Sequence, residues 1–468
     1  MAVAAGLAIW DIDAQRTEAG RNNNRPSCVF VIDCLKHPEE AKVLRLVYGP
    51  SFFLVGIICD REIRLENLRR KYTGAPDQKL EALMEIDAAE EAKQGQQVRK
   101  TLPLSDFFVN QNCSVRSKGE PPLDPQIRRL LGLALGTEVH RPDKDERGMY
   151  AAWGAAMRSA CLSRQVGAAI VNPAGIVIAT GTNDVPAAGG GTYGNESEQD
   201  ARCFVPLNKT PARNLAERQR NKIRHRILEG EGDGAAIQEH KPFCRSEFTK
   251  EVLYEVISQK LNQALHARTQ QNQGTPDGAH KAEPDPPFSK KMVEDILKAT
   301  PIKDLVEFSR AIHAEADAIV SLARAGGPSC QGASLYVNVF PCHLCTRQII
   351  ASGIAEVIYI EPYPKSLATI LHDDALFDPE TKDGDKAGGP LVKFRLFSGV
   401  APRRYVELFE RPEELKEPGS GGSLIDGRKR PQDPLFSLSH RQFEKTIAEE
   451  VKRLFPRAPS TASEETKT

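Results

Sequence analysis

Two short motifs in the second half of the chain have the residue types and spacing of a catalytic zinc centre. They are HAE at 313–315 and PCHLC at 341–345. A CxxC pair at a helix start lets two thiolates converge on one Zn²⁺, and a histidine from a neighbouring helix adds a third ligand. Three protein ligands with a fourth position open are typical of catalytic zinc, whereas structural zinc is closed by four. The spacing therefore predicts a catalytic site with His313, Cys342 and Cys345 as ligands.

Glu315 is the expected proton carrier of this site. It follows the histidine by two positions at a predicted helix start, where its carboxylate can face a water on the metal. Zinc lowers the pKa of such a water towards ~7, and hydrolysis then needs a group that moves protons. Alone, a CxxC is more often a redox pair or half of a structural site, and HAE is common on helices. In the order H-x-E…P-C-x-x-C, the residues match the zinc-deaminase signature as a whole.

The stretch from about 145 to 375 resembles the deoxycytidylate-type branch of the cytidine deaminase superfamily. The segments RSACLSRQVGAAIV, ATGTNDVPAAGGGTY, HAEADAI and PCHLCTRQIIASGIAEVIYIEPYPKS carry the resemblance. It implies Zn²⁺ as the cofactor, Glu315 as general acid/base, and contact between Asn183 and the deoxyribose. The other residues that it implies near the nucleotide are Ser163, Arg164, Gln165, Ala314, Lys365 and Ser366. A role for Arg164 also follows from its chemistry, since guanidinium groups pair with phosphate bidentately.

Strand and helix signals place these motifs in an α/β fold. A β-hairpin is predicted from 165–172 and 175–183, with its turn at 173–175. A helix around 302–324, a strand at 334–339, a helix at 342–353 and a strand at 355–361 follow. We expect a cytidine-deaminase-like three-layer α/β/α domain over 140–410, with an insert at about 195–300.

The N-terminal block is a second α/β region. Strands are predicted at 28–33 and 52–59 and helices at 36–48 and 61–72, which indicates a parallel sheet covered on both faces. Residues 8–110 resemble the later part of a P-loop kinase-like domain. No G-x-x-x-x-G-K-[ST] motif occurs, and without it there is no phosphate cradle. We expect a partial domain and linker over 1–125 that is truncated or has lost nucleotide binding, and we assign it no kinase activity.

The combination of the two domains resembles the bacterial anti-phage dCTP/dCMP deaminases. This resemblance implies hydrolytic deamination of a free dCMP or dCTP, which would deplete deoxycytidine nucleotides during phage infection. Two alternatives stay open: a deaminase of tRNA or single-stranded DNA, and a non-catalytic nucleotide-sensing regulator. The polynucleotide hypothesis predicts a compact, basic chain, whereas this chain is neutral and has a second α/β region. The regulator hypothesis does not explain the H-x-E motif, because a binding module needs no proton-carrying glutamate.

Composition limits the partners. In 468 residues, 63 basic and 63 acidic side chains cancel, so the whole chain has no net attraction for nucleic-acid phosphates. No apolar run approaches the ~20 residues of a membrane span, and the N-terminus lacks the basic start of a signal peptide. We expect a cytoplasmic homo-oligomer with no membrane partner and no stable nucleic-acid complex, while a regulatory RNA stays open.

Three further features of the sequence are given structural rather than functional interpretations. Cys203, His240 and Cys244 are spaced too loosely for a second zinc site and are better read as structural residues. The basic run at 218–227 has few aromatic residues for base stacking, so a solvated helix face is favoured. Residues 411–468 are expected to form a flexible extension with a short helix.

Overall fold

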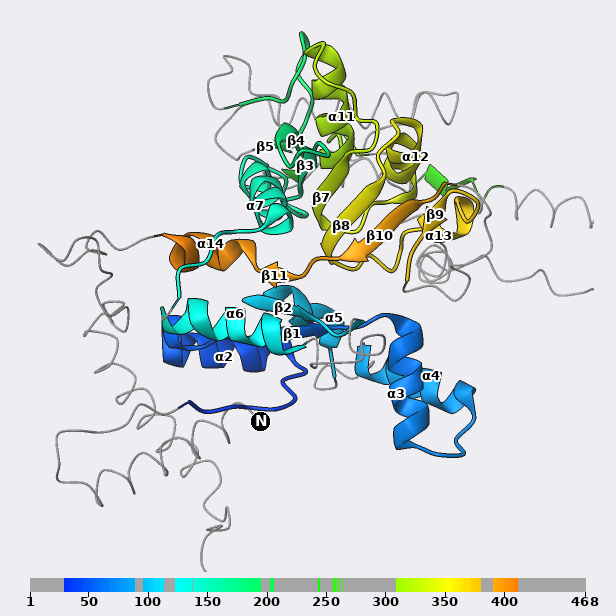
Figure 1. The fold of residues 1–468 in the computed structure, drawn as a ribbon. Coiled ribbons are helices and arrows are strands. Elements are labelled where there is room, and N and C mark those ends of the chain that lie inside the picture. Colours follow the sequence, from blue (N-terminus) through cyan, green and yellow to red (C-terminus); the bar gives the residue numbers. More distant parts are fainter. Residues whose placement is uncertain are drawn as a thin grey trace, which may run out of the picture.

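The computed structural model describes residues 29–88, 96–112, 123–136, 138–194, 309–379 and 390–410, together with ten residues between 203 and 263. Within these ranges the helices and strands form two α/β units, one above the other in the view of Figure 1. The basic run at 218–227, His240 and the predicted C-terminal helix lie outside the described residues. In the described part of the chain, no helix is long and apolar enough to cross a membrane.

A six-stranded sheet forms the centre of the larger unit, with the strand order β4-β3-β7-β8-β10-β9. β3 pairs antiparallel with both β4 and β7, whereas β7, β8, β10 and β9 run parallel. The predicted hairpin and the strands predicted at 334–339 and 355–361 are confirmed. The strands are β3 (Gly167–Val171), β4 (Val177–Thr182), β7 (Ser334–Val339), β8 (Glu356–Glu361), β9 (Leu376–Phe377) and β10 (Val392–Leu396).

Helices cover this sheet on both faces and give the three layers expected from the sequence. α7 (Lys144–Ala156) packs on one face, and α11 (Ala314–Arg324) with α12 (His343–Ala351) on the other; the short α13 (Ala368–Leu371) packs against α12. Side chains alternate between the two cores. In β7, Leu335 and Val337 lie in the α11 core, whereas Tyr336 lies in the α7 core. The zinc motifs thus start the helices of one face only.

The smaller unit has a three-stranded sheet. β1 (Val55–Ile58) runs parallel to β2 (Phe107–Asn110), and β11 (Gly399–Val400) pairs antiparallel with β2. The sequence did not predict β2, and β11 comes from the far end of the chain. The helices and 3₁₀ turns of this unit are α2 (Pro38–Tyr48), η1 (Gly49–Ser51), α3 (Arg61–Lys71), α4 (Asp77–Ala88), α5 (Val98–Thr101), η2 (Leu102–Leu104), α6 (Leu123–Leu135) and α14 (Pro402–Phe409).

Two N-terminal predictions need correction. The strand predicted at 28–33 is wrong, because 29–33 have no strand pairing and Val29 and Val31 are 74% and 88% exposed. An apolar run becomes a strand only when a neighbour accepts its backbone hydrogen bonds. β1 is confirmed, but Ile57 is 64% exposed, so the sheet is not covered on both faces. The helices predicted at 36–48 and after Asp60 are confirmed as α2 and α3.

The C-terminal part of the described chain also joins the two units, which the chain already connects between α6 and α7. Residues 392–410 leave the large sheet as β10, add β11 to the small sheet and end as α14 (Figure 1). At this junction the fully buried Glu146 accepts two bonds from Arg129, at 2.6 and 2.7 Å, and one from the Val400 amide at 2.8 Å. A buried carboxylate is retained only when it is paired in this way. β11 and α14 therefore contact the N-terminal sheet although they lie within 140–410, and the domain boundaries stay a prediction.

In the insert, the described residues include a short ladder of β5 (Phe204–Val205) and β6 (Phe243–Cys244). Cys203 is buried beside it. Because His240 lies outside the described residues, the interpretation of this cysteine group is unchanged.

We predict that Gly181 sets the distance between α11 and the sheet. A Cβ at this position would lie 2.1 Å from the Ala314 carbonyl oxygen and 2.3 Å from the Ala318 nitrogen. Gly181→Ala must therefore push α11 from β4, and overpacking of this kind costs about 1–3 kcal/mol in denaturant unfolding. Gly154→Ala is the control, because nothing beyond its chain neighbours and its own helix backbone lies within 4 Å of the added Cβ, and we expect it to be neutral or slightly stabilising. Equal stability of the two variants would contradict the prediction.

Candidate zinc centre

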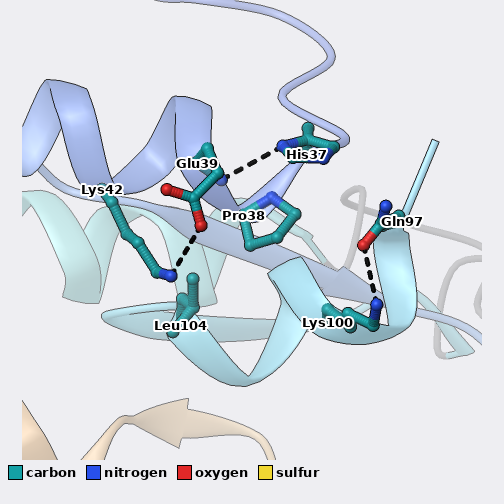
Figure 2. A pocket seen from close by; sticks show the side chains of 7 residues that line it. All are labelled: His37, Pro38, Glu39, Lys42, Gln97, Lys100 and Leu104. Atoms are coloured by element: carbon teal, nitrogen blue, oxygen red, sulfur yellow. Dashed lines mark hydrogen bonds and ion pairs between the residues drawn. The ribbon is translucent and has the colours of Figure 1, made fainter. Parts of the chain in front are cut away.

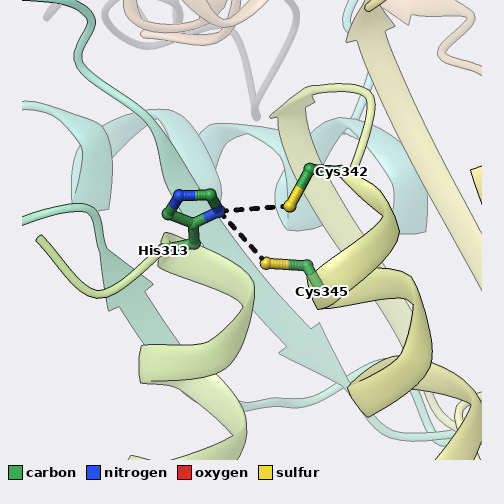
Figure 3. Close-up of side chains that lie close together, drawn as sticks. All are labelled: His313, Cys342 and Cys345. Carbon is green, nitrogen blue, oxygen red and sulfur yellow. Dashed lines mark hydrogen bonds between the residues drawn. The ribbon is translucent and has the colours of Figure 1, made fainter. Parts of the chain in front are cut away.

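Two helix starts bring the predicted zinc ligands together. His313 is the N-cap residue of α11, Cys342 is the N-cap residue of α12, and Cys345 lies in the first turn of α12. Figure 3 shows the imidazole facing both sulfur atoms. Nδ1 of His313 lies 3.3 Å from Sγ of Cys342 and 3.4 Å from Sγ of Cys345. The ligand atoms of the three residues all lie within 4.8 Å of one another.

This donor set fits zinc. With Zn–S near 2.3 Å and Zn–N near 2.0 Å, neighbouring ligand atoms of a tetrahedral site are about 3.5 Å apart, close to the separations seen here. Two thiolates and one imidazole suit a borderline-soft ion, and both cysteines are buried. Among the described residues, this is the one group of three or more His, Cys, Asp or Glu side chains placed to hold a metal. His313, Cys342 and Cys345 would supply three of the four ligands.

Glu315 lies at the same place. It is in the first turn of α11 and is 4% exposed. Burial raises the pKa of its carboxyl, which also interacts with the thiol of Cys345. A raised pKa brings a carboxyl group closer to the pH range in which general acids and bases work.

Hydrogen bonds among the three candidate ligands shift their pKa values. The hydrogen bond between the two cysteines lowers the pKa of Cys342 and raises that of Cys345. The hydrogen bond between Cys342 and His313 raises the pKa of the histidine to about 9. Metal ligation needs deprotonated thiols and a neutral imidazole, so zinc uptake must release protons from this cluster.

The predicted nucleotide loop lies between α7 and β3. Ser163, Arg164 and Gln165 are exposed, and Arg164 pairs with Glu361 at the end of β8, with 2.6 Å between Nη2 and Oε1. The Asn183 amide accepts a hydrogen bond from the Val166 N–H (2.6 Å) and donates one to the Arg164 carbonyl (2.7 Å). Asn183 therefore braces this loop, a role that the sequence did not suggest.

The three other predicted substrate residues lie around the zinc ligands. Ser366 donates its hydroxyl to the Pro341 carbonyl at 2.8 Å and so supports the turn before Cys342. Lys365 is exposed in the same turn, and Ala314 is fully buried against β4.

Two buried aspartates hold the surroundings of the site and were missed by the sequence reasoning. Asp317 accepts the Thr182 N–H at 2.9 Å and ties α11 to β4. Asp184 accepts the Ala160 N–H at 2.9 Å, and its carbonyl accepts the N–H of Ile312, next to His313, at 2.9 Å. The motif GTNDVP contains Asp184, but only the fold shows that it joins three segments.

A pocket of about 450 Å³ lies elsewhere, on α2 and α5 of the N-terminal unit (Figure 2). Lys42 pairs with Glu39, and Lys100 donates to Gln97. With both lysines bonded inside the pocket, we assign it no ligand. Its lining residues are His37, Pro38, Glu39, Lys42, Gln97, Lys100 and Leu104.

Comparison with known proteins supports a deaminase-type zinc region. Residues 254–361 match the family described as "Cytidine and deoxycytidylate deaminase zinc-binding region", and this range contains all three candidate ligands and Glu315. The chain is 46% identical over 55 residues to the deoxycytidylate deaminase of Enterobacteria phage T2, covering 12% of this chain and 29% of that protein. It is 44% identical over 55 residues to ComE operon protein 2 of Bacillus subtilis, covering 12% and 29%.

The aligned part thus spans less than a third of the length of these relatives. A solved structure of the cyanophage S-TIM5 dCMP deaminase in complex with dCMP and dUMP is also similar, at 15% identity. It covers 55% of this chain and 98% of that chain with a TM-score of 0.25, which is too low to establish a common fold. The sequence matches, together with the cluster, identify a zinc-binding region of the cytidine and deoxycytidylate deaminase type, with zinc as its cofactor.

The cluster predicts how zinc content depends on its cysteines. Purified wild type should contain about one zinc per chain, and Cys342→Ala or Cys345→Ala should remove most of it, because two ligands hold zinc poorly. Cys330→Ala is the control, since this thiol lies outside the cluster. Metal analysis by mass spectrometry gives the ratio. Full zinc retention in both cluster variants would refute the ligand assignment.

Proposed function

We propose that this chain is a zinc-dependent deaminase of a free deoxycytidine nucleotide. It would hydrolyse the C4 amino group of dCMP to give dUMP and ammonia. The observation that carries the proposal is the buried carboxyl of Glu315 beside three zinc-type ligands from two helix starts. The family match and the deoxycytidylate deaminases among the relatives support the substrate class.

Proton transfer by Glu315 explains the chemistry. His313, Cys342 and Cys345 would hold the zinc, which would supply the Lewis-acid activation that makes water a nucleophile near neutral pH. Glu315 accepts a proton from the attacking water and gives it to N3 of the cytosine ring as the new C4–O bond forms. It then carries the remaining proton of that water, from the new C4 hydroxyl, to the C4 amino group, so that the C4 carbonyl forms, the C–N bond breaks and ammonia leaves. Each transfer needs a carboxyl that gains and loses a proton in turn.

Selection of a free nucleotide is assigned to Asn183 and Arg164. The Asn183 amide retains one N–H and one lone pair beyond its two loop hydrogen bonds, and these would hold the deoxyribose 3′-hydroxyl. Arg164 would hold a phosphate, since its pairing with Glu361 through Nη2 leaves its other N–H groups for an anion. Lys365 and Ser366 would contact further phosphates, Ser163 and Gln165 the nucleotide, and Ala314 the base.

A triphosphate substrate and a defence role are the finer parts of the proposal. Both follow from the resemblance to anti-phage deaminases, and an additional phosphate would reach Lys365 in the exposed turn after β8. Comparing dCMP with dCTP in turnover assays decides the first. Phage plaque counts on cells carrying wild-type or Glu315→Gln protein decide the second, because only an active enzyme would reduce them.

Replacing Glu315 tests the mechanism. Glu315→Gln keeps the shape of the side chain but cannot carry a proton, so ammonia release should fall by at least the ~10²–10⁴-fold attributed to general acid–base catalysis. Zinc content should be unchanged, which separates loss of chemistry from loss of metal. Wild-type turnover by this variant would rule out Glu315 as the proton carrier.

Substrate choice tests the free-nucleotide proposal. We expect dCMP or dCTP to be deaminated and single-stranded DNA and tRNA to be untouched, because a strand continues where the 3′-hydroxyl must bind. Asn183→Ala should lower kcat/KM, since a site built for a hydroxyl loses heavily when a partner is missing. Arg164→Ala should mainly raise KM and reduce the preference for nucleotide over nucleoside. Deamination of an oligonucleotide with free nucleotides untouched would favour the polynucleotide alternative.

A further inference from the structure

We propose that Asn338 is a positioning residue for the phosphate-binding arginine. It would fix the backbone of the loop at 163–167 and thereby place Arg164 relative to the zinc ligands. This inference rests on the function proposed above and adds a residue that none of the motifs contains.

The Asn338 amide uses both of its ends on this loop. Its Oδ1 accepts the Gly167 N–H at 2.8 Å, and its Nδ2 donates to the Gln165 carbonyl at 3.0 Å. Asn338 lies in β7 on the same face as Tyr336, the face covered by α7, whose C-terminal end leads into the loop. Its backbone continues within four residues to Cys342.

Asn183 completes the arrangement from the other side. Four consecutive backbone positions are held by two amides in alternation: Arg164 and Val166 by Asn183, and Gln165 and Gly167 by Asn338. An amide side chain can donate and accept in this way at any pH, because it carries an N–H donor and a carbonyl acceptor on one planar group. The loop is therefore fixed between β4 and β7, the strands on either side of β3.

The support of the backbone matters because few contacts fix the Arg164 side chain itself. Arg164 is 43% exposed at its side chain, and its ion pair with Glu361 is at the surface, where such pairs contribute little. Fixing the backbone beneath it reduces the conformational entropy that phosphate binding would otherwise lose. Asn338 also ties that backbone to β7, and the chain that leaves β7 after Val339 leads directly to Cys342, so one short segment connects the arginine loop with the zinc ligands.

The test compares dCMP with deoxycytidine in full-length wild type and Asn338→Ala. For dCMP we expect KM to rise about tenfold, equivalent to about 1.4 kcal/mol, with kcat and zinc content little changed. For deoxycytidine, which has no phosphate, the change should be much smaller. Asn172→Ala is the matched control, because this asparagine also accepts a backbone N–H, from Ile176 at 2.9 Å, but in the hairpin turn at the other end of β3.

A double-mutant cycle separates positioning from general stability. Adding Asn338→Ala to Arg164→Ala should cost no more for dCMP than Arg164→Ala alone, because both changes remove the same interaction. Equal losses for dCMP and deoxycytidine, or additive losses in the cycle, would overturn the inference. If Asn338→Ala fails to fold, Asn338→Ser, which can keep one of the two bonds, replaces it with the same expectations at smaller amplitude. A wild type inactive on both substrates would instead overturn the proposed function, and with it this inference.

Discussion

The convergence of two helix starts is the constraint on which the rest of the structure depends. α11 and α12 come from separate crossings of the sheet, yet both begin at one place, with His313 and Cys342 as their N-cap residues. Amides at a helix N-terminus favour the negative charge that thiolate ligands carry when they hold a metal. The close contact of α11 with Gly181 and the Asp317 bond to Thr182 keep this helix start in register with the sheet. A shift of either helix would separate the imidazole from the thiols.

The candidate zinc ligands and the candidate nucleotide loop come from opposite faces of the larger sheet. The zinc motifs begin helices on one face, whereas the arginine loop arrives from α7 on the other. The two meet at the end of the sheet where β7 and β8 finish and β3 starts. The carboxyl ends of parallel strands are where α/β sheets commonly bind ligands. The amides of Asn183 and Asn338 work at this end of the sheet. The junction of the two units, at Glu146 and β11, lies at the opposite end of α7 from the loop, so the N-terminal unit supports α7 from that end.

The sequence was enough to predict the cluster of His313, Cys342 and Cys345 and much of the larger sheet. The motifs HAE and PCHLC are short, so their residue types and spacing can be recognised in the sequence. The two strands of the hairpin are also adjacent in the sequence, and their pattern is therefore local. Long-range pairing was not accessible in the same way. β11 adds to β2 across almost three hundred residues, and the exposed run at 29–33 has the composition of a strand but no partner. Asn338 and Asp184 were missed because a single polar residue carries no pattern, and its role appears only when three segments lie together.

X-ray absorption at the zinc edge tests the central claim most directly, since it counts the ligand atoms in the purified protein. Two sulfur atoms near 2.3 Å and light ligands near 2.0 Å, one of them an imidazole, are predicted for a centre with three protein ligands and one position for water. A shell of four sulfur atoms would mark a closed structural site. That result would contradict the account, because Glu315 would then have no water to work on.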